Sequence, residues 1–580
     1  MIIGIDLGTT NSVAAYMAAD GPKLIPNALG EYLTPSVVGA EKSGKLLVGR
    51  AAKDFQVLEP ERCVSQFKRF MGLDKKLEIG GKSFSPEQLS SLVLKAIKQD
   101  AEVFLNAPVQ EAVITVPAYF NDNQRKATIA AGQIAGFDVK RILNEPTAAA
   151  LAYGMHCGRE DRTLMILDLG GGTFDVSIVE VFDGTIEVKA SSGECFLGGE
   201  DFTASMAAYL LKLRGEVLEQ SELKHPKMVS RLIQQCELAK RKLSKDDCAS
   251  IRIPDYSGEF HDNSKVCEMT ISQFNDATSR ILERAELPIR RALGDAEISR
   301  DRIDQVLLVG GATRMRSFVD YVKHKFQREP KSQLNPDEVV AIGAAVQAGL
   351  FANNAIVEDL VVTDVSPFTL GIAISKKIGD ENLPDYFLPI INRNTTIPVS
   401  RVDRVQTISP NQTKIDVHVY QGEGRMIKDN LKIGSFEASG IPPGPSGQEI
   451  DVRFTYDLNG VLEVEATIVK TGKKISHVIT QHAKSLTPMD IKRAIEQMQT
   501  YKHHPRDELV NQAVLRRAER IYKELPLQQR DQLGDMIDGF EGVLQSQDKQ
   551  AIGEIRQLLE LALDRLEGNN DKSSESYLPW

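Results

Sequence analysis

Apolar and polar positions alternate in three different ways along this chain of 580 residues. Over residues 1 to about 357, short apolar runs that end in Gly or Asp are separated by stretches with a helical period, such as Pro86 to Leu105 and Val229 to Leu243. Strands that alternate with helices in this way predict an α/β fold.

The second part, from Val365 to about Ile479, consists of short runs with a period of two. Lys414 to Gln421 alternates polar and apolar residues, and a turn at residues 457–460 separates Ile450 to Tyr456 from Val461 to Ile468. Hairpins at this spacing predict a compact β-sandwich.

The third part, from about residue 485, returns to a helical period. Thr487, Pro488 and Asp490 are typical of a helix start, and apolar residues then recur at helical spacing as far as Leu566. We expect a helical bundle that lies over the sandwich, followed by a short polar tail.

A turn of unusual composition lies within the first part, between two apolar strands from Thr163 to Val181. Asp168 and Asp175 flank the three glycines Gly170 to Gly172. Glycine has no Cβ, so its amide can approach an anion closely, and carboxylates are hard oxygen ligands. The stretch predicts a β-hairpin whose turn holds a phosphate chain with Mg²⁺.

The same design occurs at the N-terminus, where Ile5-Asp6-Leu7-Gly8 aligns with Leu167-Asp168-Leu169-Gly170. A third glycine site, Val306 to Arg314, again follows an apolar run. One glycine-rich turn is usually only a turn, but three at strand ends favour a duplicated unit whose halves face each other across a nucleotide.

Composition narrows the class of protein further. Hydrophobic residues make up 42% and charged residues 26% of the chain, as in ordinary globular proteins, and the net charge of −10 gives no general attraction to nucleic acid or anionic lipid. The first residues lack a signal-peptide pattern and no apolar run is long enough for membrane insertion, so we expect a cytoplasmic protein. The six cysteines form no CxxC pair, which favours reduced thiols over disulfides or zinc ligands.

Four longer motifs resemble those of the actin-like ATPase superfamily and, within it, the DnaK-type family of 70-kDa heat-shock chaperones. They are AVITVPAYFND at Ala112 to Asp122, RILNEPTAAALAYG at Arg141 to Gly154, LGGEDF at Leu197 to Phe202, and NPDEVVAIGAAVQA at Asn335 to Ala348. The resemblance covers nearly the whole chain. It implies an ATP-dependent chaperone that binds extended apolar peptides of unfolded or specific clients, with a J-domain co-chaperone as a partner.

The resemblance also implies a multidomain architecture. The expected parts are an actin-like, two-lobed ATPase domain (residues 1–357), an interdomain linker (358–364), a β-sandwich that binds peptides (365–484), a helical lid (485–567) and a tail (568–580). Taken alone, the apolar run in Asp359 to Asp364 is equally typical of a buried edge strand. Thr363 stands where the family usually has leucine, which predicts weaker docking of the linker.

Both lobes look trimmed relative to the family, which is typical of its specialised HscC branch. The segment Ile253 to Ile271 is short for the exposed loop of the second lobe, and few residues separate Gly72 from Pro86. We therefore expect rapid release of ADP and little response to a GrpE-type exchange factor.

For the cleft, the resemblance implies residues that position Mg²⁺ and water and stabilise charge on the transferring phosphoryl group. The catalytic set is Lys68, Glu145, Asp168, Thr173 and Asp175, with Asp6 and Asp168 at the hydrated metal. The nucleotide-binding set is Asp6, Gly8, Thr9, Thr10, Asn11, Gly170, Gly171, Gly172, Gly198, Gly199, Glu237, Lys240, Arg241, Ser244, Gly310, Gly311, Arg314 and Asp337. The implied cofactors are ATP or ADP, Mg²⁺ and K⁺.

Each of these assignments has a plainer alternative. Lys68 alone is typical of a solvated helix residue and Glu145 of a surface charge, and the spacing from Glu237 to Ser244 also fits an exposed helix with salt bridges. Ala312 stands where the family often has serine.

Two further sets come from the resemblance. Pro117, Arg125, Arg141 and Asp364 match positions that couple the domains, although a proline at a strand end is often only structural. Ile372, Val405, Ile408, Ile415 and Val417 match the peptide pocket, although alternating apolar residues are more often plain core. A small-molecule kinase or a filament-forming ATPase of the same superfamily is the alternative function, but it leaves residues 365–580 without a role.

Overall fold

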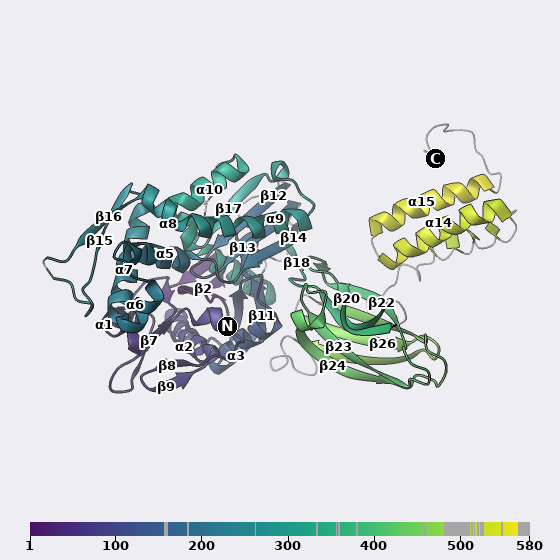
Figure 1. Ribbon diagram of the computed structural model, residues 1–580, viewed down its shortest axis with the longest axis horizontal. Coiled ribbons are helices and arrows are strands. Elements are labelled where there is room, and N and C mark those ends of the chain that lie inside the picture. Colours follow the sequence, from purple (N-terminus) through teal and green to yellow (C-terminus); the bar gives the residue numbers. More distant parts are fainter. Residues whose placement is uncertain are drawn as a thin grey trace.

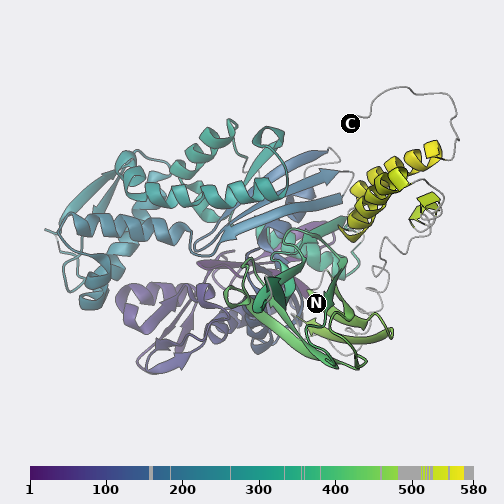
Figure 2. The ribbon, with the colours of Figure 1, turned by 45° about the vertical axis from the view of Figure 1, so that its right-hand side comes forward.

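The computed structural model describes residues 1–155, 161–182, 185–261, 263–331, 334–354, 356–357, 360–378, 381–457, 460–480, 511, 514–515, 517–518, 521–522, 527–546 and 549–566. Figure 1 shows two α/β lobes at the left, a pair of β-sheets at the lower right and two helices at the upper right. Turning the molecule in Figure 2 brings the two lobes one above the other. The α/β part, the β part and the helical part thus follow the three patterns of the sequence.

Lobe I comprises residues 1–155 together with helix α11 (Val339–Phe351), which packs on its sheet. Its main sheet has the order β11-β10-β1-β2-β3, with β4 paired to β2. The strands are β1 (Ile2–Asp6), β2 (Asn11–Ala18), β3 (Gly21–Ile25), β4 (Thr34–Pro35), β10 (Glu111–Val116) and β11 (Asp138–Asn144). Strands β1, β10 and β11 run parallel, and most of their residues are buried because both faces of the sheet are covered.

The rest of lobe I consists of small sheets and helices around that sheet. The smaller strands are β5 (Val37–Ala40), β6 (Leu46–Val48), β7 (Cys63–Ser65), β8 (Leu77–Ile79) and β9 (Lys82–Phe84). The helices are α1 (Arg50–Leu58), η1 (Pro60–Arg62), η2 (Phe67–Phe70), α2 (Pro86–Leu105), α3 (Asp122–Ile134) and α4 (Glu145–Gly154). Helix α2 begins where the sequence predicts, because Ser85 and Gln88 form a capping box around a proline in the first turn.

Lobe II, residues 161–337, repeats the strand–turn–strand core. Its sheet has the order β17-β12-β13-β14-β18-β21. The strands are β12 (Arg162–Leu169), β13 (Phe174–Phe182), β14 (Thr185–Glu194) and β17 (Gln305–Val309), with β15 (Cys248–Arg252) and β16 (Val266–Thr270) as a separate ribbon. The helices are α5 (Gly199–Lys212), α6 (Leu218–Lys224), α7 (Pro226–Leu243), α8 (Ile271–Arg284), α9 (Glu286–Asp295), η3 (Arg300–Arg302), η4 (Gly311–Arg314) and α10 (Arg316–Phe326).

The two lobes share a core between their sheets. Helices α4 and α11 pack on each other and contribute Ala148 and Ala344 to a buried cluster that also contains Leu164 and Val309 of lobe II. Small residues allow this approach: a Cβ on Gly343 would lie 1.7 Å from the carbonyl oxygen of Ala148. The lobes therefore meet at a tight helix pair beneath the predicted nucleotide turns.

The β part is a sandwich of two four-stranded antiparallel sheets with one apolar core between them. The first sheet has the order β20 (Glu381–Ile391), β19 (Leu370–Ile378), β23 (Lys414–Gln421) and β24 (Leu431–Ser439), with η5 (Ile427–Asp429) beside it. The second has the order β22 (Val399–Gln406), β25 (Glu449–Tyr456), β26 (Val461–Ile468) and β27 (Lys473–Thr480). The β19–β20 hairpin ends in polar residues, where Lys377 pairs with Asn382.

Strand β18 (Val361–Val365) links the lobes to the sandwich. It runs parallel to β14 through Ile186 and Val362 and antiparallel to the short β21 (Thr396–Ile397) through Asp364 and Ile397. The predicted linker segment is thus also an added edge strand, which reconciles the two interpretations of its apolar run.

The sandwich contacts both lobes beside this strand. Arg393 makes two hydrogen bonds of 2.9 Å to Asp295 of lobe II, and Gln421 accepts from the backbone amide of Asp122 of lobe I at 3.0 Å. The rings of Tyr119 and Phe368 lie 4.8 Å apart. The sandwich is therefore docked against the lobes on both sides of the linker.

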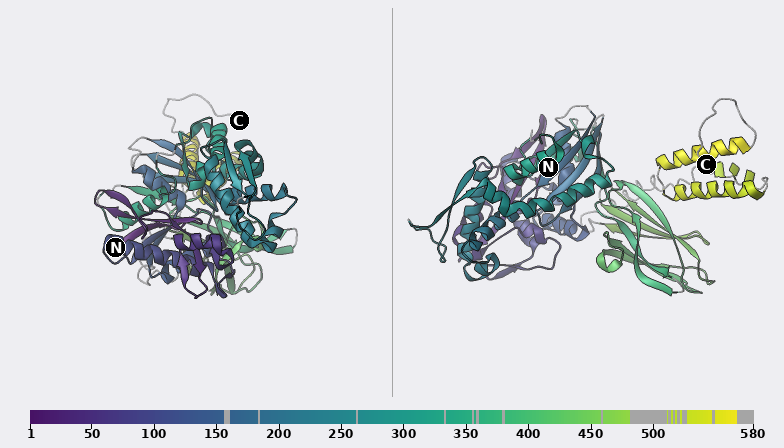
Figure 3. Two further views of the ribbon diagram at one scale, coloured as in Figure 1. Left: turned by 90° about the vertical axis from the view of Figure 1, so that its left-hand side faces the viewer. Right: turned by 45° about the horizontal axis from the view of Figure 1, so that its top comes forward.

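Helices α14 (Leu527–Ser546) and α15 (Lys549–Leu566) pack together through Phe540 and Leu559. Figures 1 and 3 show this pair clear of the sandwich, so it does not lie over the sheets as the sequence led us to expect. The predicted helix start at Thr487, Pro488 and Asp490 and the tail at 568–580 lie outside the described residues.

Candidate functional site

A cavity of about 530 Å³ lies between the two lobes. Its wall is formed by turns and helix ends from both lobes rather than by a continuous surface of one. The lining residues are Asp6, Gly8, Thr9, Thr10, Asn11, Leu33, Lys68, Glu145, Asp168, Gly170, Gly171, Thr173, Gly199, Glu200, Glu237, Lys240, Arg241, Ser244, Lys245, Gly310, Gly311, Ala312, Arg314, Met315, Pro336, Asp337 and Val340.

Two hairpin turns face each other at one end of the cavity. Asp6 ends β1 and pairs with Val13, and Asp168 near the end of β12 pairs with Asp175 across the hairpin. The turns are so close that a Cβ on Gly171 would lie 1.8 Å from the hydroxyl oxygen of Thr10. This geometry explains the glycine and leaves backbone amides of both turns beside the cavity.

Four carboxylates crowd around one lysine at this end. The Lys68 ammonium donates to Glu145 Oε1 at 2.7 Å, and both side chains are buried. Burial first, and the charge of Glu145 second, raise the pKa of Asp6 to about 7 and the pKa of Asp175 to about 8. The same causes raise the pKa of Asp168 well above its ordinary value. The site therefore has more carboxyl groups than Lys68 can balance, and their charged forms are disfavoured unless another cation binds.

This surplus of carboxylates fits a divalent cation. The described residues contain no group of three or more His, Cys, Asp or Glu that could hold a metal unaided. A magnesium ion here would therefore take phosphate and water oxygens as well, with Asp6 and Asp168 beside it. Thr115 donates to Asp6 Oδ1 at 3.0 Å and so fixes the direction of that carboxylate.

Helix α7 supplies the opposite wall. Lys240 donates to the carbonyl oxygen of Gly199 at 2.7 Å and to the hydroxyl of Thr203 at 2.8 Å. Glu237 pairs with Lys240 and Arg241, both at 2.7 Å. Although burial opposes it, the two cations lower the pKa of Glu237 to about 2. The helix thus presents a fixed carboxylate and a half-exposed guanidinium to the cavity, a surface suited to hydroxyl groups and a flat base.

The third glycine site closes the cavity at lobe II. Gly310 has φ of +81°, and a Cβ on Gly311 would lie 2.3 Å from Asp337 Oδ1. Arg314 donates to Asp337 at 3.0 Å and to Asn335 at 2.5 Å. Because glycine is required in both places, the turn can bring Arg314 and Asp337 to the cavity edge.

Most of the predicted cleft residues share this cavity, but three do not line it. Asp175 is buried behind Asp168. Gly172 and Gly198 lie against each other, since a Cβ on Gly198 would lie 2.4 Å from the amide nitrogen of Gly172. Sequence reasoning missed Glu200, whose carboxylate accepts from Thr10 at 3.2 Å across the cleft. Its place in the motif LGGEDF could have revealed it.

Two of the predicted coupling residues, Arg125 and Asp364, are joined through Asn144. Arg125 donates to the carbonyl oxygen of Ala118, next to Pro117, at 3.1 Å and to Asn144 Oδ1 at 2.7 Å. Asn144 in turn donates to both carboxylate oxygens of Asp364 in the linker, at 3.2 and 3.1 Å. Asn144 directly precedes Glu145 in the chain, so one hydrogen-bonded residue lies between the linker and the cleft.

Arg141 lies beside these contacts and stays within the lobes. It donates to Gln347 of α11 at 3.0 Å, and burial lowers the pKa of its guanidinium although the charge of Asp364 raises it.

The predicted peptide residues lie at three depths in the sandwich. Ile372 and Val417 are each 3% exposed and belong to its core. Val405 and Ile415 are half-buried against that core, and Ile408 is 49% exposed. Strands β19 and β23 pair only from Leu370 to Ile372 of β19, so the sheet opens beyond that point, towards Ile415.

Comparison with known proteins gives a consistent result. The family described as Hsp70 protein matches residues 2–577. Chaperone protein DnaK of Thermotoga neapolitana is 43% identical over 510 residues, which cover 86% of this chain and 83% of that protein. Chaperone protein DnaK of Thermotoga maritima is 41% identical over 557 residues, which cover 92% and 91%. Within the described residues, no helix is both long and apolar enough to span a membrane.

Proposed function

Because the chain belongs to the Hsp70 family, whose members are ATP-hydrolysing chaperones, we propose that it captures extended apolar segments of client proteins in its sandwich and couples this capture to ATP hydrolysis in the cleft. The observation that carries the proposal is the relay from Arg125 through Asn144 to Asp364. Asn144 bonds Asp364 and directly precedes Glu145, and we propose that a change at the linker reaches the carboxylate of Glu145 by this route.

In this proposal the cleft residues divide the work of hydrolysis. Lys68 stabilises the charge that develops on the transferred phosphoryl group, and Glu145 orients water. Thr9 and Thr10 donate to phosphate oxygens, while Thr173 and Asp175 orient water or a K⁺ ion. Mg²⁺, when bound beside Asp6 and Asp168, supplies neutralising charge to the phosphates.

Nucleoside binding falls to the opposite wall. We assign the ribose hydroxyl groups to Glu237 and Lys240 and the base to Arg241 with Ser244, since these side chains line the cavity from one helix face. Gly310, Gly311, Arg314 and Asp337 close the other side of the base. Ala312 leaves one polar contact to the base unmade.

We also propose that the domain borders are those expected from the sequence, with residues 358–364 as the linker and 485–567 as the lid. A J-domain co-chaperone would act at Arg141 and Asp364, where the lobes and the linker meet. Its effect would pass to Glu145 through Asn144. The trimmed second lobe favours the HscC branch of the family and little need for a GrpE-type exchange factor.

The test is phosphate release measured with and without an extended apolar peptide. We expect the peptide to accelerate release, and we expect Ile415→Phe to abolish both peptide binding and acceleration while leaving basal release unchanged, because pocket and cleft lie in separate domains. Ile475→Phe, in β27 of the second sheet, is the matched control and should retain binding.

Other outcomes would replace the proposal. Transfer of phosphate to a metabolite would indicate a kinase, and sedimentation with ATP would indicate a filament. Unchanged affinity for the peptide in Ile415→Phe would place the pocket elsewhere.

A further inference from the structure

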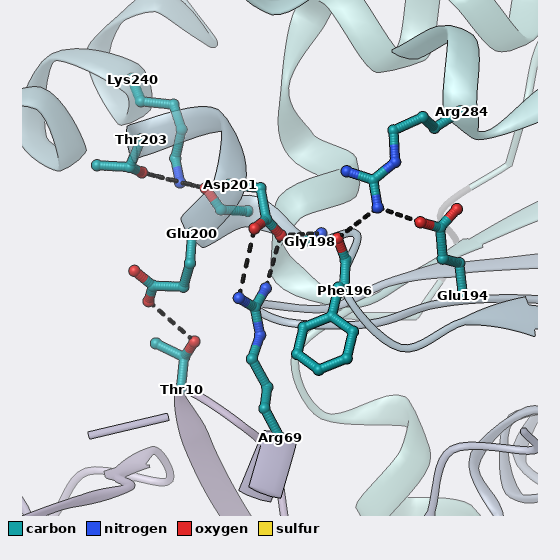
Figure 4. Close-up of polar contacts among 11 residues, drawn as sticks. Thr10, Arg69, Glu194, Phe196, Gly198, Glu200, Asp201, Thr203, Lys240 and Arg284 are labelled. Carbon is teal, nitrogen blue, oxygen red and sulfur yellow. Dashed lines mark hydrogen bonds and ion pairs between the residues drawn. The ribbon is translucent and has the colours of Figure 1, made fainter. Parts of the chain in front are cut away.

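Arg69 lies next to Lys68 in η2, and its side chain crosses from lobe I to lobe II. Its guanidinium makes two hydrogen bonds to Asp201 in the first turn of α5, at 3.3 and 2.6 Å. The side chain is 10% exposed, and Figure 4 shows it reaching up from lobe I to the carboxylate. Such a paired, planar contact fixes direction as well as distance.

Asp201 passes this contact on to the phosphate turn. Its second role is to accept a hydrogen bond from the amide of Gly198 at 2.8 Å, which holds the start of α5. That helix start then binds the glycine turn: the amide of Gly199 donates to the carbonyl oxygen of Gly170, and the amide of Glu200 to that of Gly171, both at 2.9 Å.

Arg69 also touches the turn itself. A Cβ on Gly172 would lie 2.5 Å from Arg69 Nε and 2.7 Å from Thr9. The Nε atom is buried and has no hydrogen-bond partner among the described residues, because it is packed against the glycine backbone. Neither Arg69 nor Gly172 lines the cavity, so the arginine supports the turn from behind and does not reach a nucleotide.

We propose that Arg69 is a positioning residue for ATP hydrolysis, whose ion pair with Asp201 clasps the two lobes behind the phosphate turn. The clasp sets Lys68, its neighbour in η2, against the glycine turn of lobe II. Hydrolysis then depends on closure, because opening of the cleft breaks the pair and withdraws Lys68 from the phosphate chain. The inference rests on the proposed hydrolysis in the cleft.

The experiment measures single-turnover ATP hydrolysis and the release of a fluorescent ADP analogue in the full-length protein. We expect Arg69→Ala to slow hydrolysis about tenfold or more, since small displacements of catalytic groups cost rates of that order, and to accelerate ADP release. Asp201→Asn keeps an oxygen for the Gly198 amide but removes the charge, and it should do the same. Arg69→Lys keeps the charge without the paired contact and should give an intermediate rate.

The double variant Arg69→Ala/Asp201→Asn distinguishes a clasp from two independent roles. If the residues act through each other, the double variant is no slower than the slower single variant. If the double variant slows hydrolysis by the product of the two single effects, the inference is overturned. Hydrolysis within twofold of the wild-type rate in Arg69→Ala would also overturn it. If Arg69→Ala does not fold, the rates of Arg69→Lys and Asp201→Asn are compared with wild type instead. Slower hydrolysis in both supports the inference, and rates within twofold of wild type in both overturn it.

Arg284→Ala is the matched control. Arg284 pairs with Glu194 a short distance away in Figure 4, but both residues belong to lobe II. Its loss should leave hydrolysis and ADP release unchanged, and equal slowing there would overturn the inference. A wild-type protein without ATPase activity would instead contradict the proposed function itself.

Discussion

At the scale of single residues, Lys68 is the cation that faces the crowded carboxylates of the cleft. We predict that Lys68→Ala still binds ATP but loses most hydrolysis, because removing one donor aimed at developing charge typically costs about 3 kcal/mol, roughly a hundredfold in rate. Single-turnover hydrolysis checks this. A rate near that of wild type would remove Lys68 from the catalytic set. Lys126→Ala is the control, because Lys126 pairs with Asp122 on α3 and does not line the cavity.

A second prediction concerns Asp168, whose substitution should have opposite effects on stability without metal and on nucleotide binding with Mg²⁺. Because burial raises the pKa of Asp168 well above its ordinary value, the folded protein disfavours the charged carboxylate, and this residue lowers the free energy of unfolding as the pH rises above that ordinary value. In metal-free protein at pH 8, Asp168→Asn should therefore raise the melting temperature. With Mg²⁺ and ATP it should bind nucleotide more weakly, because the cation loses a nearby oxygen charge.

Melting curves with and without Mg²⁺-ATP test both signs of the Asp168 prediction in one series. A lower melting temperature in the metal-free variant would show that the carboxylate is stabilised by contacts that the charge argument omits. Equal stabilisation of wild type and variant by Mg²⁺-ATP would place the metal elsewhere.

Single residues also mark where sequence reasoning ends. Asp6 and Asp168 could be found from the residues alone, since a carboxylate before a glycine turn has a chemical reason to be there. Lys68 and Glu145 could not, because their pairing depends on the approach of two segments far apart in sequence. Arg69 was missed for the same reason: its partner Asp201 is visible only when the lobes are assembled.

At the scale of elements, the linker strand β18 contains a buried hydroxyl group that lacks a hydrogen bond in the described part of the chain. The hydroxyl of Thr363 is buried without a hydrogen-bond partner among the described residues, opposite Glu187 of β14. An unmet buried hydroxyl costs about 1–3 kcal/mol. We predict that Thr363→Val strengthens docking of the linker, seen as slower backbone hydrogen exchange over residues 361–365.

A matched substitution tests the cause. Val361 lies in the same strand but is 55% exposed, so Val361→Thr should leave exchange unchanged. Equal or faster exchange in Thr363→Val would show that the hydroxyl finds a partner in solution.

Elements with local signals were predicted well. The bounds of α2, β23 and β26 agree with the sequence expectation, because helix caps, polar–apolar alternation and turns depend on residues that are neighbours in sequence. The end of the β19–β20 hairpin could not be predicted, because its polar residues show no alternation that would reveal the pairing of Lys376 with Leu383. Pairing between strands is set by contacts that a local pattern does not contain.

At the scale of the whole molecule, nucleotide exchange requires the lobes to separate, so its rate depends on what holds the far ends of the lobes together. The trimmed segment between β15 and β16 could have replaced the missing loop as a latch. Instead Arg231 of α7 donates to the carbonyl oxygen of Gly258 at 2.6 Å, and Tyr256 stacks on His225 and donates to Glu216. These partners all belong to lobe II, so the segment is fastened to its own lobe.

Lys53 of α1 is the lobe I cation that faces lobe II at this end. Burial first and the charge of Arg241 second lower the pKa of Lys53, and both outweigh the attraction of Glu237 and Glu200. A lysine whose charge is disfavoured in the closed form makes a poor latch. Hydrogen bonds between Thr10 and Glu200 and between Arg69 and Asp201 join the lobes at the phosphate end of the cleft, whereas at the other end α1 and η1 pack on α7.

We predict rapid spontaneous release of ADP, with hydrolysis as the slow step of the cycle and little acceleration by a GrpE-type protein. Stopped-flow release of a fluorescent ADP analogue, compared with the single-turnover hydrolysis rate, measures this. Tyr256→Ala should not change the release rate, because that ring contacts lobe II alone. A substitution that removes Arg241 should have two effects together: it stabilises the charged form of Lys53, and it removes a contact to the base. Slow release that a GrpE-type protein strongly accelerates would show that a latch forms elsewhere between the lobes.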